Sequence, residues 1–304
     1  MASLSQQPPR PLVVGTRGSP LALVQAQQVL QRLHALGVPA TLQPIRTSGD
    51  RGQRRGVGVF VKELEEALLH GQVDLAVHSL KDMPTQQPPG LRMAAVLERA
   101  DARDALVSPF GSLDRLPARA RVGCGSPRRI AQLRALRPDL DYIPITGNVD
   151  TRLRKLDAGL YEAIVLALAG LLRMGWEGRA TQVFSFAEML PAPGQGAIAL
   201  EVREGDAYAT RLAQALNHWP TWWSVLAERA FLRALGGGCR VPIAAYAHVQ
   251  DQRLVLDGLA ITPDGQTCIR GQVEGLPADA EALGVALAQD LLRRGANRLV
   301  GSPV

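Results

Sequence analysis

Residues 12–37 read LVVGTRGSPLALVQAQQVLQRLHALG, and this stretch decides the fold class. The apolar run Leu12–Gly15 is typical of a buried strand, whereas the pattern from Pro20 to Leu36 is helical and ends at Gly37. Only the short polar turn Thr16–Pro20 separates the two. A strand, a turn and a helix in this order predict an α/β fold.

The same alternation continues along the chain. Strands are expected over residues 41–47 and 73–79, with a helix over 60–69 between them, and this alternation predicts a mostly parallel sheet. A second series begins near Asp101, with strands expected at 121–124, 142–145 and 163–168 and helices at 127–136 and 149–157. The sequence therefore predicts two α/β domains of similar construction.

The C-terminal part follows a different pattern. The Pro/Gly-rich stretch Met189–Gly196 is a candidate hinge or crossover, after which one more strand at 197–202 and a helix pair over 206–235 are expected. Strands at 243–249, 253–261 and 267–273 then precede an amphipathic helix over 278–294. Hairpin strands followed by one helix predict a small α+β domain.

Composition excludes several classes of protein. The chain has 304 residues, of which 46% are hydrophobic and 20% charged, so a disordered or fibrous protein is excluded. The longest apolar stretch, Ala163–Leu172, is far shorter than the roughly 20 residues of a membrane helix. The N-terminal MASLSQQPPR lacks the apolar core of a secretion signal, and we expect a cytoplasmic protein that contacts no membrane.

The charged residues and the cysteines narrow the choice of ligand. The formal charge is +6, but basic residues are spread along the chain and aromatic residues are only 4%, so nucleic acid is not the expected partner. Only Lys62, Lys81 and Lys155 are lysines, and the planar forks of the many arginines suit a polyanionic small molecule; genomic base composition or thermal adaptation is the alternative explanation. Three cysteines without CxxC spacing predict neither a disulfide framework nor a metal site.

Candidate site residues follow the expected strands, where open α/β sheets bind their ligands. The turn Thr16–Pro20 offers Arg17, Ser19 and a helix N-terminus to an anion, although ordinary helix capping is the favoured interpretation of this turn taken alone. The segment His78–Pro84, HSLKDMP, brings Lys81 and Asp82 to the end of a strand. A carboxylate there can move protons and stabilise a developing cation, and a solvated surface pair is the alternative.

In the second series, three segments supply arginines after strands. GCGSPRR (123–129), GNVDTR (147–152) and AGLLR (169–173) are expected to direct them to one edge of the sheet, where they can bind several carboxylates. The residues concerned are Ser126, Arg128, Arg129, Arg152 and Arg173. Cys124 could act as a nucleophile at a helix N-terminus, but a buried thiol that packs as a small hydrophobe is the favoured interpretation.

The segment Gly236–Pro242, GGGCRVP, puts Cys239 on a glycine-rich loop beside Arg240, which would favour its thiolate. His78 and Cys239 invite comparison with a Cys-His hydrolase, but no signature of such an enzyme is present. Cys268 falls within an expected strand and should pack as a small hydrophobe.

These motifs, taken together, resemble the porphobilinogen deaminase (hydroxymethylbilane synthase) family over nearly the whole chain. The matching stretches, in order, are TRGSPLAL, FVKELEEALL, DLAVHSLKDMPT, GNVDTRLRKLD, LPAPGQGA, AERAFL and GGCRVPI. The resemblance implies two periplasmic-binding-protein-like (type II) α/β domains and a small C-terminal α+β domain. It implies domain 1 at 1–98 and 197–216, domain 2 at 101–192, and domain 3 at 219–304.

The resemblance also implies the chemistry. Members of the family are transferases of tetrapyrrole and heme biosynthesis that join four porphobilinogen molecules head to tail, with loss of ammonia, and release hydroxymethylbilane by hydrolysis. The growing chain is built on a dipyrromethane cofactor held by a thioether, and Cys239 matches the attachment cysteine. Asp82 matches the catalytic carboxylate. The residues that match substrate- and cofactor-contacting positions are Arg17, Ser19, Lys81, Ser126, Arg128, Arg129, Arg152 and Arg173.

Three departures from the family pattern stand out: Thr146 and Val57 replace usual basic residues, and GCGSPRR replaces the commoner GTSSxRR. We expect a monomer whose partners are porphobilinogen and its linear oligomers. The alternatives are a two-domain anion- or solute-binding protein and an inactive paralogue of the same fold. Cys239 on its glycine loop and the third domain argue against a simple binding protein, which needs neither.

Overall fold

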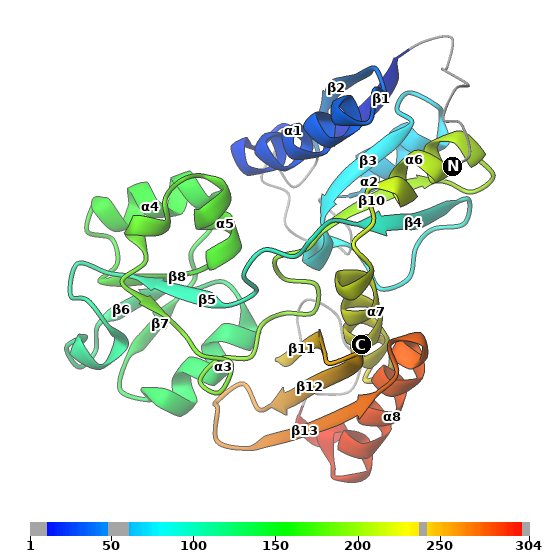
Figure 1. The fold of residues 1–304 in the computed structure, drawn as a ribbon. Coiled ribbons are helices and arrows are strands. Elements are labelled where there is room, and N and C mark those ends of the chain that lie inside the picture. The colour runs from blue at the N-terminus through cyan, green and yellow to red at the C-terminus, as the bar shows by residue number, and fades with distance from the viewer. Residues whose placement is uncertain (1–10, 48–60, 237–241, 300–304) are drawn as a thin grey trace. The chain divides into compact units, whose positions relative to one another are not determined.

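The computed structural model describes residues 11–47, 61–236 and 242–299 of the chain (Figure 1). The chain divides into two compact units. The first comprises Met1–Glu98 and Ala197–Trp219, and the second Arg99–Gly196 and Pro220–Val304. Across the described ranges, no helix is both long enough and apolar enough to cross a membrane.

The first unit is built on a five-stranded sheet of order β2-β1-β3-β10-β4. The strands are β1 (Leu12–Arg17), β2 (Ala40–Ile45), β3 (Leu75–Ser79), β4 (Leu91–Val96) and β10 (Ile198–Arg203). The helices are α1 (Pro20–Ala35), α2 (Lys62–Leu69) and α6 (Ala207–Ala215), and a 3-10 turn, η1 (Leu80–Asp82), follows β3. Apolar residues of α1 and α6 share one core cluster with β1 and β3, whereas α2 packs against the other face with Ala76.

The second unit contains a similar sheet of order β7-β6-β8-β5-β9. Its strands are β5 (Asp104–Val107), β6 (Arg121–Gly123), β7 (Asp141–Ile143), β8 (Ala163–Ala167) and β9 (Gln182–Val183). Its helices are α3 (Pro127–Leu136), α4 (Val149–Asp157) and α5 (Leu168–Arg173), with 3-10 turns η2 (Leu113–Arg115) and η3 (Glu177–Arg179). Leu133 of α3 packs in one core cluster, and Leu153 of α4 and Leu171 of α5 pack in another.

The same unit includes the C-terminal antiparallel sheet β11-β12-β13. Its elements are α7 (Trp219–Ala234), β11 (Ile243–Gln250), β12 (Arg253–Ile261), β13 (Cys268–Gly275), η4 (Pro277–Asp279), α8 (Ala280–Arg293) and α9 (Ala296–Leu299). Helices α7 and α8 pack closely because Gly284 has no side chain: a Cβ there would lie 2.3 Å from the Ala227 carbonyl oxygen. Ala131 of α3 joins Ala244 and Leu259 in a small core cluster, so the two sheets of this unit share a packed boundary.

The helices and strands expected from the sequence are present with small shifts at their ends, but the expectation of mostly parallel sheets is wrong. In the first unit β1 pairs in parallel with β2 and β3, whereas β10 is antiparallel to β3 and β4. In the second, β6 is parallel to β7 and β8, and β5 is antiparallel to β8 and β9. The physical reason is the path of the chain: β10 enters the first sheet from a distant segment and inserts between β3 and β4.

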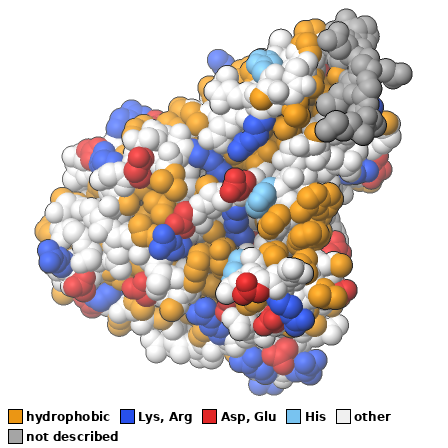
Figure 2. Space-filling model, in the orientation of Figure 1, with side chains coloured by type: hydrophobic (Ala, Val, Ile, Leu, Met, Phe, Trp, Pro, Cys, Tyr) orange, Lys and Arg blue, Asp and Glu red, His pale blue; other side chains and the backbone are white. Residues whose placement is uncertain are grey.

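The surface carries charges of both signs. On the face in Figure 2, lysine and arginine side chains are interspersed with aspartate and glutamate rather than gathered in one stripe.

Candidate functional site

In the first unit, the turn after β1 is organised around the start of α1. Ser19 is the N-cap residue of this helix, and its Oγ accepts a hydrogen bond of 3.4 Å from the Ala22 amide. Thr16 Oγ1 donates to the Ala22 carbonyl at 3.1 Å, while the Arg17 side chain is half-buried. Pro20 occupies the first turn, where its missing N–H costs nothing. Ser19 therefore caps the helix, and anion binding by Arg17 and Ser19 stays a prediction.

The second candidate segment lies directly after β3, as expected. Lys81 and Asp82 belong to the 3-10 turn η1 and are half-buried. The start of the turn is tied to a distant segment, because the Leu80 amide donates to the Ala197 carbonyl at 3.1 Å, and the turn is closed by its own hydrogen bond of 3.0 Å from the Met83 amide to the Leu80 carbonyl. The Asp82 carboxyl is thus presented at the carboxyl end of a buried strand, where a ligand of an α/β sheet is expected.

His78, four residues before Asp82, is buried and lies within the sheet. Its Nε2 is 3.0 Å from Glu201 Oε2, and both side chains are almost inaccessible to solvent. The structure does not test a Cys-His pair with Cys239. Cys239 itself lies outside the described residues.

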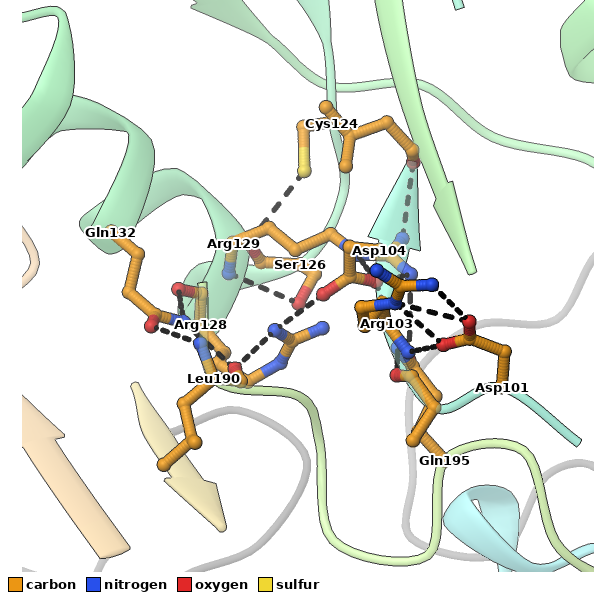
Figure 3. A network of polar contacts seen from close by, with 12 residues as sticks. Asp101, Arg103, Asp104, Cys124, Ser126, Arg128, Arg129, Gln132, Leu190 and Gln195 are labelled. Carbon is orange, nitrogen blue, oxygen red and sulfur yellow. Dashed lines mark hydrogen bonds and ion pairs between the residues drawn. The ribbon is translucent and has the colours of Figure 1, made fainter. Parts of the chain in front are cut away.

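In the second unit, the arginines of the GCGSPRR segment form a buried cluster with one aspartate (Figure 3). Arg128 Nη1 donates to Asp104 Oδ2 at 2.7 Å and to the Leu190 carbonyl at 2.8 Å. Arg129 donates to Asp104 Oδ1 from Nε at 2.9 Å and from Nη2 at 2.7 Å. Both arginines lie in the first turn of α3, which Ser126 caps by accepting from the Arg129 amide at 3.5 Å.

The electrostatics of this cluster follow from its composition. Burial opposes the ionised form of Asp104, but the charges of Arg128 and Arg129 outweigh burial and hold the pKa of this carboxyl well below its usual range. Gln195 adds a hydrogen bond of 2.9 Å to Asp104 Oδ1. One carboxylate faces two guanidinium groups, so the cluster retains positive charge. Within the described residues, Arg128 Nε is a buried donor without a hydrogen-bond partner.

Arg152 and Arg173 lie in α4 and α5, the helices that follow β7 and β8. Because β6, β7 and β8 run parallel, the helix starts that carry Arg128, Arg129 and Arg152 lie at one edge of the sheet, whereas Arg173 is the last residue of α5. Arg173 Nη2 donates to the Gly196 carbonyl at 2.6 Å, beside the Gln195 that contacts Arg129 at 3.5 Å. Arg152 Nε donates to the Gly147 carbonyl at 2.8 Å, within its own turn.

The structure also places a cation beside Thr146, where the family commonly has arginine. Lys155 Nζ lies 3.0 Å from the Thr146 carbonyl oxygen and 3.5 Å from its Oγ1. The ammonium group of Lys155, in α4, therefore lies close to the position at which Thr146 replaces the usual basic residue.

The two described cysteines differ in environment. Cys124 is buried, burial raises the pKa of its thiol, and its Sγ lies 3.8 Å from the Ser126 carbonyl oxygen, so it is a packing thiol as expected. The expectation for Cys268 is wrong, because it is exposed. It is the first residue of the edge strand β13, on the sheet face opposite the half-buried Ile269, which packs against the core.

The sequence analysis missed three buried polar residues: Asp104 and Gln195 in the second unit, and Glu201 in the first. Asp104 and Glu201 are fully buried charged residues within strands, in the stretches RDALV and IALEV. A charge inside an apolar strand rarely stays buried without a partner, and this is the signal that could have identified both.

The fold and the polar residues at the strand ends define a multidomain α/β protein with a positively charged cluster suited to an anionic ligand. Two family models then cover almost the whole chain: "Porphobilinogen deaminase, dipyromethane cofactor binding domain" matches residues 12–211, and "Porphobilinogen deaminase, C-terminal domain" matches residues 222–293. The chain belongs to the porphobilinogen deaminase family.

Curated relatives match this chain over nearly their full length. The chain is 50% identical over 297 residues to porphobilinogen deaminase of Thermus thermophilus, with 96% of this chain and 98% of the relative covered. It is 47% identical over 300 residues to that of Syntrophotalea carbinolica, with 96% and 95% covered. Among solved structures, a periplasmic substrate-binding protein of an ABC transporter from Coxiella burnetii covers 72% of this chain and 96% of that chain, at 16% identity and a TM-score of 0.46.

Proposed function

We propose that this protein is a porphobilinogen deaminase, which joins porphobilinogen molecules with loss of ammonia and releases hydroxymethylbilane. The observation that carries the proposal is the full-length match, in which the C-terminal domain is included, to relatives that bear this name. The alternative of a two-domain solute-binding protein is not favoured, because the C-terminal domain would have no purpose there. We further propose that the enzyme acts as a cytoplasmic monomer.

The residues of the second unit fit an anionic dipyrromethane cofactor. The cluster of Arg128, Arg129 and Asp104 has more positive than negative charge, and a buried Arg128 donor lacks a partner among the described residues. A carboxylate is the natural complement of such a donor set, since guanidinium groups bind carboxylates through paired hydrogen bonds. When bound, the cofactor supplies the pyrrole primer to which the first substrate molecule is joined. Arg128, Arg129 and Ser126 would hold its carboxylates, with Arg152 and Arg173 serving the longer oligomer.

Asp82 is the proposed catalytic group. Departure of ammonia leaves a positive charge on the pyrrole, and a fixed carboxylate stabilises that charge more in the transition state than in the ground state. The same carboxylate can hold the pyrrole N–H proton and pass a proton on when the new bond forms. The fixed 3-10 turn keeps Asp82 in place for both tasks. Arg17, Ser19 and Lys81, at the same edge of their sheet, would bind the acetate and propionate of the incoming substrate.

Cys239 is proposed as the attachment residue on the motif match alone, since it lies outside the described residues. Cys124 is not suited to attachment, because it is buried and its thiol pKa is raised.

The test is porphobilinogen turnover by the wild type and by Asp82→Asn. The amide keeps the shape of the side chain but loses its charge and its proton acceptor, so turnover should fall by about 10²-fold or more. Asp114→Asn is the matched control, because Asp114 also sits in a three-residue 3-10 turn, η2, and should leave turnover unchanged. Near-normal turnover by Asp82→Asn would refute the role of Asp82, whereas an inactive wild type that carries its cofactor would refute the proposed function.

A further inference from the structure

Glu201 contacts two residues that flank the Lys81–Asp82 turn in the sequence. Its Oε2 lies 3.0 Å from His78 Nε2, just before the turn, and its Oε1 accepts a 3.0 Å hydrogen bond from Gln87 Nε2, in the loop after it. A single carboxylate thus holds both ends of the segment 79–86. Nothing in the chemistry of the proposed reaction uses Glu201, which is fully buried.

The geometry of the sheet explains why these side chains meet. Strand β10 pairs antiparallel with β3, and Ala199 lies opposite His78 while Glu201 lies opposite Ala76. His78 and Glu201 are therefore diagonal neighbours on one face of the sheet. On the other face, Ser79 Oγ donates to Gln25 Oε1 of α1 at 3.0 Å. The end of β3 is consequently fixed from both faces immediately before the turn begins.

The burial of Glu201 gives these two contacts weight. A buried carboxylate depends on its hydrogen-bond partners, so loss of one of them is costly to the local structure. Glu65 of α2 lies near Glu201: burial, together with the charge of Glu201, raises the pKa of Glu65. His78 is a basic side chain near both carboxyl groups, and it holds Glu201 on the strand side.

We propose that Glu201 is a positioning residue for the reaction: by binding His78 and Gln87 it holds the turn that carries Lys81 and Asp82 in its productive place. The inference rests on the proposed role of Asp82. It assigns to Glu201 no contact with substrate or cofactor; its effect passes through the backbone of the turn. Displacement of a reacting group by about 1 Å can cost about 10²-fold in rate, so a loosened turn should reduce kcat.

Substitution of Gln87 tests the proposal with little risk to folding, because Gln87 is a half-buried loop residue. Gln87→Leu removes one of the two contacts, and Gln87→Glu sets two carboxylates against each other. The double variant Gln87→Glu, Glu201→Gln exchanges the partners: the carboxylate introduced at position 87 accepts from the amide introduced at position 201, and the oxygen of that amide can still accept from His78. Gln182→Leu is the matched control, because Gln182 is also a half-buried glutamine whose side chain binds a separate segment: its Oε1 accepts from the Leu113 amide at 2.7 Å, in the second unit.

Two measurements on the cofactor-loaded protein decide the outcome. Amide hydrogen exchange in peptides covering 80–86 should accelerate about tenfold or more in the single Gln87 variants, since a lost tertiary contact of about 1.4 kcal/mol opens the segment tenfold more often. In the same variants kcat should fall about tenfold with KM changed far less, because the loss concerns the transition state. The double variant should recover most of both values, and Gln182→Leu should change neither.

Unchanged exchange and kcat in both Gln87 single variants would overturn the proposal. The proposal would also be overturned if the double variant were as impaired as Gln87→Glu in exchange and kcat. The effect of residue 87 would then not depend on its contact with residue 201. A failed proposed function has a different signature: the wild type itself would not consume porphobilinogen, whereas the exchange pattern of residues 80–86 would still report on the two contacts.

Discussion

Replacement of Asp104 by asparagine should destabilise the second unit strongly. Asp104 is completely buried and its two oxygens receive hydrogen bonds from Arg128, Arg129 and Gln195, at 2.7 to 2.9 Å. Asparagine preserves the volume of the side chain but removes its charge. The two guanidinium groups, whose side chains are only 5% and 8% exposed, would then repel each other without a carboxylate between them.

The expected loss of unfolding free energy in Asp104→Asn follows from the burial of Arg128 and Arg129. Removal of one member of a buried ion pair costs about 3–5 kcal/mol, since the remaining charge stays desolvated and unpaired. By contrast, an ion pair open to solvent contributes about 0–1 kcal/mol. Asp101 and Arg103 form such a pair three residues away, with side chains 26% and 39% exposed, and Asp101→Asn is therefore the matched control.

The assay is urea unfolding at pH 7, followed by far-UV circular dichroism, of the wild type and both variants. Asp104→Asn should lower the free energy of unfolding by about 3–5 kcal/mol and Asp101→Asn by about 1 kcal/mol or less. Equal losses for the two variants would refute the reasoning, because they would show that the buried cluster is no more sensitive to its carboxylate than an exposed pair.

Two further predictions concern pH and the glycine at the end of the crossover. The folded-state pKa of Asp104 is depressed, so its ionised form stabilises the fold above about pH 4. The difference in unfolding free energy between the wild type and Asp104→Asn should therefore be constant above that pH and become smaller as the pH falls below it. A difference that becomes larger in acid would contradict this prediction. Gly196→Ala should cost more than about 1–3 kcal/mol, because Gly196 has φ +86° and a Cβ would lie 2.5 Å from the Ala100 carbonyl oxygen. Gly205→Ala, with φ +82° and nothing within 4 Å, measures the backbone strain alone in the same urea titration, and an equal cost for both variants would exclude the clash.

Local structure could be predicted from the sequence where it depends on local chemistry. Ser126 followed by Pro127 indicates the start of α3, and the structure confirms the cap and the helix from Pro127 to Leu136. The position of Lys81 and Asp82 directly after a buried strand is likewise confirmed. These features depend on neighbours within a few residues.

Features that depend on distant segments escaped prediction. The antiparallel insertion of β10 between β3 and β4 has no signal in the alternation of strands and helices, because it is a property of the chain path. The partners of the functional residues escaped for the same reason: Glu201 meets His78 across 123 positions of sequence, and Asp104 meets Arg128 across 24. The arginines were expected to bind ligand carboxylates, and no local pattern in the sequence indicated that Asp104 already binds Arg128 and Arg129.

The most direct test of the central claim, that this chain is a porphobilinogen deaminase with its primer on Cys239, is the intact mass of the purified protein. From a host able to make porphobilinogen, the wild type and Cys124→Ser should both carry the mass of a covalent dipyrromethane, which peptide mapping should assign to Cys239, and Cys239→Ser should carry none. An unmodified wild type, or an adduct mapped to Cys124 or Cys268, would contradict the account.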